Sequence, residues 1–326
     1  MTKFERILIT KTPLAYFLNK SKHWKLPGFQ GVPLYDVLRF FYKQIKTHGL
    51  TERASAISYN FMMAIPPSLL FLFTLIPNLP FVSKRTIQIQ LNRTIHDIVP
   101  SNVYNKELIK FVDAFIWGDR IALLSFGLLL ALYFSSNAMM GLIRSFNRKN
   151  YIGFEKRMGL LARWNAIKLT IIMFLLFAGY FLLLISQGVI LKLLIKNQNW
   201  RNLISNTRWI FIILLIFFAV GYIFKYAPSV KKRWKLNSPG TITTTLLSIL
   251  STVGFSFFVK KFARYNVLYG SIGTVMMIMA LIYINALVLL IGFELNVSIN
   301  SLKIIATDRT QKENKKEQNE TKNTTP

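Results

Sequence analysis

Residues 270–298 read GSIGTVMMIMALIYINALVLLIGFELNVS, and the one charged side chain among them is Glu294. A helix rises about 1.5 Å per residue, so a hydrocarbon core of about 30 Å is crossed by about 20 residues. Every backbone donor inside a bilayer needs an internal partner, and the run lacks the alternation of a barrel strand. The stretch therefore predicts a membrane-spanning α-helix.

Working outward from this run, we find five further apolar segments of spanning length. They are Ser55–Leu79, Ile121–Ile143, Ala166–Leu191, Trp209–Tyr226 and Thr241–Val259. The sequence thus predicts an all-α fold, a polytopic membrane helical bundle of six transmembrane helices.

Composition supports this class. Of the 326 residues, 52% are hydrophobic and 17% are charged, against about 25% charged in soluble domains. The net charge is +28, yet a soluble nucleic-acid binder would expose these apolar runs to water. We therefore expect membrane lipids as partners and no nucleic acid. There is no cysteine, which excludes disulfides and thiolate chemistry.

The basic residues predict an orientation. With a cytoplasmic N-terminus, 27 of the 41 Lys and Arg fall in inside segments and 13 in outside segments. The positive-inside rule then places both termini in the cytoplasm. The oligomeric state does not follow from the sequence.

Three regions are expected. Residues 1–53 form a cytoplasmic segment with an interfacial helix near Leu34–Ile45, whose apolar residues recur at helical spacing. Residues 54–300 form the membrane domain, including an external helical connection at 79–120 that is too long for a plain loop. Residues 301–326 form a polar tail that we expect to be disordered.

The first span contains Tyr59 and the doublet Pro66-Pro67. Proline removes a backbone donor and clashes with the preceding turn, so this helix is expected to kink or break. The break would serve as a cavity wall or hinge, or it would be a packing kink satisfied by neighbouring helices.

The fifth predicted span carries a polar stripe at helical spacing, made of Thr241, Thr245, Ser248, Thr252 and Ser256. Such stripes let helices approach and hydrogen-bond to one another. The alternative is a hydrated path for a polar substrate.

Glu294 and its neighbour Asn296 are the polar candidates of the last span. An intramembrane carboxylate is costly and marks a functional site by default. Glu294 would couple ions or protons, or it would pair structurally with Arg144 or Lys303. Tyr269, Gly270 and Gly273 open the same span and predict a close-packed helix start.

The sequence predicts no catalytic, metal or cofactor site and therefore no enzyme. His23, His48 and His96 are scattered and do not have the spacing of metal ligands. Phosphate-loop, dinucleotide and nucleophile-elbow motifs are absent.

From Thr51 to Asn300 the chain resembles a known family through an ordered set of short motifs. They are Ala54–Tyr59 with Pro66, Ile143–Asn147, Tyr222–Pro228, Pro239-Gly240, Tyr265 with Tyr269–Gly273, and Gly292–Asn296. Together they resemble the YihY/BrkB family of bacterial inner-membrane proteins. The resemblance implies six spans with both ends cytoplasmic, a link to envelope function, and an old ribonuclease BN label.

We expect a protein that transports or handles a membrane-associated substrate, either a lipid or other envelope component or an ion. The alternative is a non-catalytic scaffold that binds envelope proteins. A ribonuclease is the third reading, and it lacks the clustered acid–base or metal-binding residues that RNA cleavage needs.

Overall fold

The computed structural model describes residues 28–47, 49–75, 121–147, 151–155, 159–194, 208–261 and 265–323, with single positions 20, 22, 24, 88 and 109. These residues confirm the all-α prediction. The helices are α3 (Leu34–Thr47), α4 (Leu50–Leu75), α7 (Ile121–Phe146), α8 (Gly159–Leu194), α10 (Arg208–Tyr226), α11 (Pro239–Lys261) and α12 (Tyr265–Asn323).

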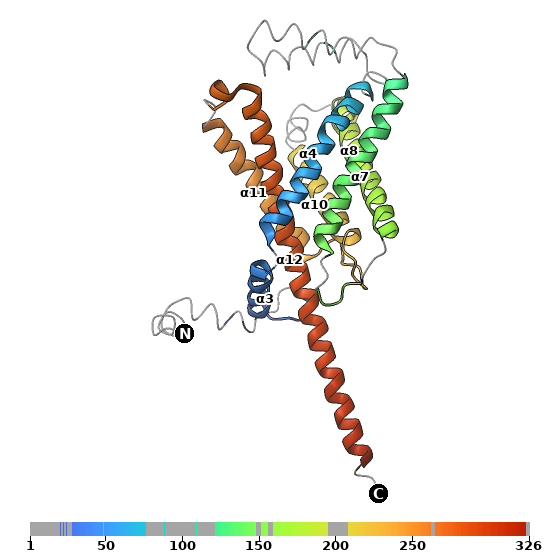
Figure 1. Ribbon diagram of the computed structural model, residues 1–326, viewed down its shortest axis with the longest axis vertical. Helices are drawn as coiled ribbons and strands as arrows, with labels where there is room; N and C mark the ends of the chain where they lie inside the picture. Colours follow the sequence, from blue (N-terminus) through green and yellow to red (C-terminus); the bar gives the residue numbers. More distant parts are fainter. Residues whose placement is uncertain are drawn as a thin grey trace.

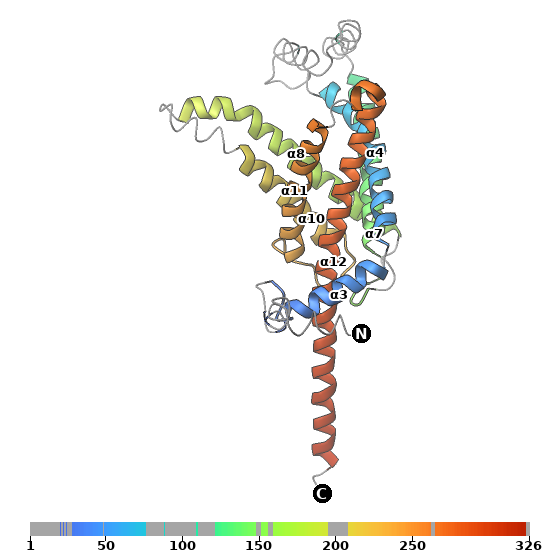
Figure 2. The same ribbon diagram turned by 90° about the vertical axis from the view of Figure 1, so that its left-hand side faces the viewer.

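Six of these helices form a closed ring in chain order. Helix α4 packs on α7, α7 on α8, α8 on α10, α10 on α11 and α11 on α12, and α12 returns to α4. Consecutive helices run in opposite directions, and α3 lies across one end of the ring against α12 (Figures 1 and 2). We call this the α3 end.

Four described helices are long and apolar enough to cross a membrane. The qualifying stretches are Ser125–Phe146, Gly159–Gly179, Pro239–Val259 and Val275–Asn314, and Ile210–Tyr226 forms a shorter apolar helix. Each lies on a predicted span, and α4 lies on the remaining one. The total of six spans stays a prediction.

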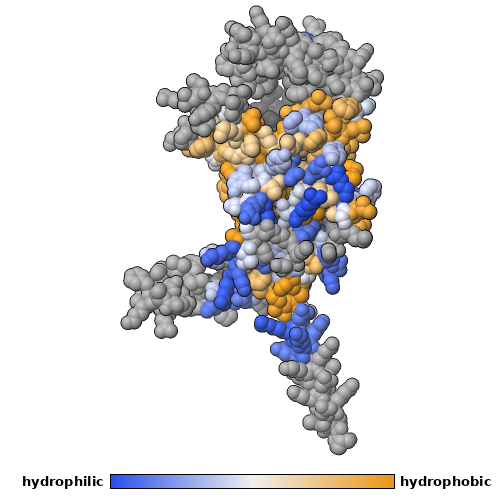
Figure 3. Space-filling view, in the orientation of Figure 1, coloured by the Kyte–Doolittle hydropathy of each residue, from blue (hydrophilic) through white to orange (hydrophobic). Residues whose placement is uncertain are grey.

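The tightest packing lies toward the α3 end. Leu142, Phe146, Phe224, Leu290 and Phe293 are fully buried in one cluster contributed by α7, α10 and α12. Farther along the bundle, apolar side chains face outward and form the apolar band in Figure 3. Exposed apolar surface of this extent is typical of a protein that contacts lipid.

Helix α4 runs through the proline doublet as one helix, so the predicted break does not occur. The prolines cannot donate to the carbonyl groups one turn earlier. The carbonyl groups of Met62 and Met63 therefore lose their usual backbone donors, and the Ser68 hydroxyl donates to the next carbonyl along, that of Ala64, at 2.7 Å. Membrane helices tolerate proline where the surrounding protein compensates for the missing donors.

The C-terminal prediction was wrong. Helix α12 continues to Asn323 and projects beyond the ring, whereas we expected disorder in residues 301–326 (Figure 1). Lys, Glu and Gln are good helix formers, and Asp308 and Lys312 form an oppositely charged pair four residues apart. The preceding membrane helix also provides the nucleus, so only propagation is needed.

Helix α3 confirms the predicted N-terminal helix. Its Val37 is fully buried in a small cluster with Phe29 and with Ile299 of α12. Its position at the membrane surface stays a prediction. The expected external connection, residues 79–120, lies outside the described residues except for positions 88 and 109.

Candidate functional site

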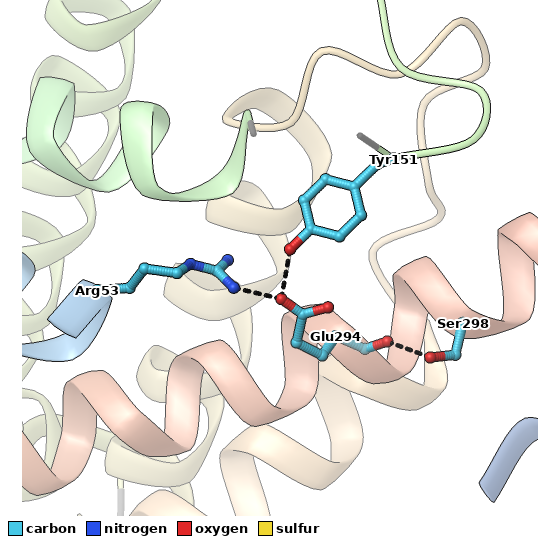
Figure 4. Close-up of polar contacts among 4 residues, drawn as sticks. All are labelled: Arg53, Tyr151, Glu294 and Ser298. Carbon is cyan, nitrogen blue, oxygen red and sulfur yellow. Dashed lines mark hydrogen bonds and ion pairs between the residues drawn. The ribbon is translucent and has the colours of Figure 1, made fainter. Parts of the chain in front are cut away.

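A buried ion pair joins the first and last helices of the ring. Arg53, in the first turn of α4, donates from Nη1 to Oε1 of Glu294 on α12. The same oxygen accepts the hydroxyl of Tyr151 at 2.5 Å, from the segment between α7 and α8 (Figure 4). Glu294 is fully buried and Arg53 is 3% exposed. Three separate parts of the chain therefore meet at one carboxylate oxygen.

Aromatic rings surround this pair. Phe293 stacks on Phe146 with ring centroids 4.0 Å apart and planes 6° apart. The Arg53 guanidinium lies 5.7 Å from the Phe293 ring centroid, and Tyr151 meets the same ring edge-on. In such a dry environment charges interact strongly, and an unpaired charge costs several kcal/mol (about 3–5).

Tyr151 serves as a neutral donor. Its burial, followed by the negative charge of Glu294, raises the pKa of Tyr151 well above its usual value of 10.0. The hydroxyl therefore stays protonated at physiological pH and donates a hydrogen bond to Glu294.

The pairing leaves polar atoms unused. Within the described part of the chain, Nε and Nη2 of Arg53 and Oε2 of Glu294 are buried without hydrogen-bond partners. Buried donors and acceptors are rarely left in this state, so the guanidinium has capacity for a further acceptor.

Arg53 also lines an open pocket of about 480 Å³ at the α3 end of the bundle. We call it the basic pocket. Its walls are Glu52, Arg53, Ala56 and Asn60 of α4, Asn137, Met140, Gly141, Arg144 and Ser145 of α7, and Arg163 of α8. Antiparallel packing explains this grouping, because the first turns of α4 and α8 lie beside the last turns of α7.

Two contacts shape the pocket. Arg163 donates to the Asn137 side-chain oxygen at 2.6 Å and lies 5.6 Å from the Tyr133 ring centroid. Asn60 faces Gly141 so closely that a Cβ on Gly141 would lie 2.7 Å from the Asn60 amide nitrogen. The walls are therefore built mainly from polar side chains held in place by their neighbours.

The structure corrects the predicted partners of Glu294. Neither Arg144 nor Lys303 pairs with it. Arg144 is exposed in the basic pocket, Lys303 is exposed on α12, and Arg53 takes the predicted role. Arg53 was missed because it stands two residues before the apolar run and was counted as a topology signal. Tyr151 had no sequence signal.

Asn296 joins α12 to the start of α11. Its Oδ1 accepts the backbone N–H of Gly240 at 2.9 Å, and its Nδ2 donates to the Ser238 hydroxyl at 2.9 Å. The backbones are close here, because a Cβ on Gly292 would lie 2.7 Å from the Gly240 carbonyl oxygen. Asn296 thus belongs to a helix contact and does not line the basic pocket.

The polar stripe of α11 is divided. Thr241, Thr245 and Ser248 are buried, whereas Thr252 and Ser256 are exposed. The Thr245 hydroxyl donates to the Thr241 carbonyl at 2.9 Å. The buried half agrees with a helix–helix interface.

The other candidate residues lie apart from Glu294. Tyr59 is 60% exposed on α4, Pro66 is exposed, and Pro67 is partly exposed farther along the same helix. Gly273 is buried on α12. Tyr269 and Gly270 lie in the first turns of α12, where the structure does not describe the side chain of Tyr269. None of these residues lines the basic pocket as described.

Comparison with known proteins gives a consistent family. The model of the family described as virulence factor BrkB matches residues 41–318. The ribonuclease-like protein YfkH of Bacillus subtilis is 27% identical over 273 residues, covering 82% of this chain and 96% of that protein. A UPF0761 membrane protein of Rhodospirillum centenum is 25% identical over 281 residues, covering 84% of this chain and 59% of that protein.

A shorter match lies in a UPF0761 membrane protein of Pseudoalteromonas translucida. It is 31% identical over 107 residues, 32% of this chain and 35% of that protein. No solved structure matches the chain. The family model spans most of the sequence, including α4, most of α12 and every residue of the basic pocket. This multi-pass membrane protein therefore belongs to the virulence factor BrkB family.

Proposed function

We propose that this protein binds a membrane-associated substrate in the basic pocket and transports or handles it. The substrate is a lipid or other envelope component, or an ion. The observation that carries this proposal is the double position of Arg53, which lines the pocket and also pairs with Glu294.

This position links pocket occupancy to helix packing. An acceptor in the pocket competes with Glu294 for the Arg53 guanidinium, and Glu294 lies on a different helix. Weakening that pair loosens the contact between α4 and α12, where the ring closes. A ligand shifts a conformational equilibrium when it interacts differently with the two states, and Arg53 supplies that difference.

We place the α3 end on the cytoplasmic side of the bacterial inner membrane, with both termini inside. The support is the excess of Lys and Arg in the segments assigned to that side. The pocket would then take its substrate at the inner leaflet.

The test is native mass spectrometry of the gently solubilised protein beside two matched variants. Ala56→Phe places a bulky side chain in the pocket, whereas Ala306→Phe makes the same change at an exposed position of α12. We expect a bound mass in wild type and Ala306→Phe that is lost in Ala56→Phe. Equal binding by all three proteins would contradict the pocket assignment.

A scaffold role is the second candidate, and the projecting part of α12 favours it (Figure 1). If the protein is a scaffold that binds partner proteins through this helix, deletion of residues 308–326 should abolish partner binding and leave any bound lipid in place. Full function after this deletion would exclude that use of α12.

We propose that the chain is not an enzyme, although one relative carries a ribonuclease-like name. The support is the scatter of the three histidines in the sequence, and all three positions lie outside the described residues. RNA cleavage by the purified protein that disappears in His96→Ala would overturn this.

A further inference from the structure

We infer that the basic pocket binds a phosphate-bearing anion, the headgroup phosphate of an anionic membrane lipid or a soluble phosphate compound. This inference rests on the proposed function, because it names the substrate class of the same pocket. The observation behind it is the convergence of Arg53, Arg144 and Arg163 from three helices onto one opening.

The charges favour an anion. The three arginines share the pocket with one carboxylate, Glu52, while Glu294 offsets Arg53 from the other side. A positive surplus therefore remains on the pocket walls. A cation would face this surplus, which argues against cation coupling as the role of the pocket.

The donors favour phosphate. Guanidinium groups match phosphate oxygens in two-point hydrogen bonds, and a phosphate group offers several acceptors to several arginines. Arg53 has buried Nε and Nη2 donors without partners in the described structure, and Arg144 is exposed at the opening. Asn60 and Asn137 add amide groups to the same walls.

The size argues against a bare ion. A pocket of about 480 Å³ falls within the range of about 300–1,000 Å³ that is typical of small-molecule sites. It holds a headgroup with room for substituents beyond the phosphate.

The surroundings fit a lipid source. Few pocket residues are apolar, so acyl chains have little to contact inside. Next to the pocket, α4 and α7 expose Tyr59, Met63, Leu129 and Tyr133. Hydrophilic side chains gather on this face beneath the apolar band (Figure 3). A lipid would thus place its headgroup in the pocket and its chains along these two helices.

The first arm of the test measures binding of phosphatidic acid and of diacylglycerol, which lacks the phosphate, to the delipidated full chain in neutral detergent, by native mass spectrometry. Wild type should prefer phosphatidic acid by about tenfold or more, which corresponds to about 1.4 kcal/mol. Arg144→Gln and Arg163→Gln should each lower phosphatidic acid binding about tenfold. Arg309→Gln removes the same charge from exposed α12 and should have no effect.

Inorganic phosphate distinguishes the two sources. Bound phosphatidic acid that resists millimolar phosphate indicates a lipid headgroup, and displacement indicates a soluble phosphate compound. Both outcomes support the phosphate assignment.

Other outcomes overturn it. Equal binding of the two lipids, or equal effects of Arg144→Gln and Arg309→Gln, would show that the pocket does not select phosphate anions through its arginines. If Ala56→Phe still removed the bound lipid in that case, the proposed function would survive and the substrate class alone would fail. Comparable thermal unfolding of all variants confirms that each protein is folded.

Discussion

The Arg53–Glu294 pair holds α4 against α12, and Arg53 also lines the pocket that we propose as the substrate site. Both are buried, both leave polar atoms unused, and one of them borders the basic pocket. Maximal stability would be served by apolar residues of similar volume, because desolvation often exceeds the attraction within a buried pair. A buried pair that does not maximise stability fits the proposed function, in which a bound acceptor competes with Glu294 for Arg53.

Removing one partner should be costly. Glu294→Gln keeps the side-chain size but leaves Arg53 buried without its counter-charge, so we expect a loss of about 3–5 kcal/mol in unfolding free energy. The double variant Arg53→Leu with Glu294→Leu should lose clearly less than either Arg53→Leu or Glu294→Leu alone, because it leaves no buried charge unpaired. A thermodynamic cycle over the four proteins measures this, and simple additivity would show that the two residues are not coupled.

Tyr151 gives the pair a dependence on alkaline pH. Its folded pKa is raised above 10.0, so above pH 10 the native state holds a proton that the unfolded state releases. The contribution of Tyr151 to stability is complete below pH 10 and is lost as the pH rises toward the folded pKa.

Tyr151→Phe should cost about 1–2 kcal/mol of unfolding free energy at neutral pH, because Glu294 loses a hydrogen-bond donor. It should also flatten the alkaline fall in thermal stability, and an unchanged slope would contradict the assignment.

The contact of α11 with α12 depends on glycines where the two backbones meet. A Cβ on Gly292 would overlap the Thr244 hydroxyl and lie 2.7 Å from the Gly240 carbonyl oxygen. Asn296 bridges the same contact through its amide group. This part of α12 therefore requires small residues and an amide for packing.

Gly292→Ala should destabilise the protein by about 1–3 kcal/mol or more, since overpacking forces the helices apart. Gly254→Ala is the matched control on α11, because nothing lies within 4 Å of its added Cβ. That change should be neutral or slightly stabilising, since Ala favours a helix over Gly. Thermal unfolding of the two variants compares them directly, and equal effects would contradict a close α11–α12 approach.

The membrane helices were predictable from the sequence because each contains an apolar run, although the run at Ile210–Tyr226 is shorter than the others. The partners of polar residues were less predictable. Glu294 was found because its charge is isolated in an apolar run, whereas Arg53 and Arg163 stand among basic residues that also set topology. Asn147 belongs to a recognised motif, but only the structure shows it holding Ala227 and Ser229 by side-chain hydrogen bonds.

The sequence did not predict which helices are neighbours in the ring. Apolar runs define where helices lie along the chain, but neighbour choice depends on packing of side chains that are far apart in sequence. The continuation of α12 was also missed, because a polar composition was read as disorder although its residues favour a helix.

Orientation is testable at the level of the entire molecule, because the chain contains no cysteine. Single variants Lys43→Cys on α3, Lys232→Cys after α10 and Thr310→Cys on α12 each place one exposed thiol. All three should resist an impermeant maleimide in intact cells and react after permeabilisation. Labelling of any one in intact cells would contradict a cytoplasmic α3 end.

The most direct test of the central claim is cross-linking in native membranes with a phospholipid that carries a photoactivatable group in its headgroup. The cross-linked residues, mapped by peptide mass spectrometry, should fall within 52–60, 137–145 and around 163, and the adducts should disappear in Ala56→Phe. Adducts confined to the outward face of α11, unchanged by Ala56→Phe, would contradict a substrate site in the basic pocket.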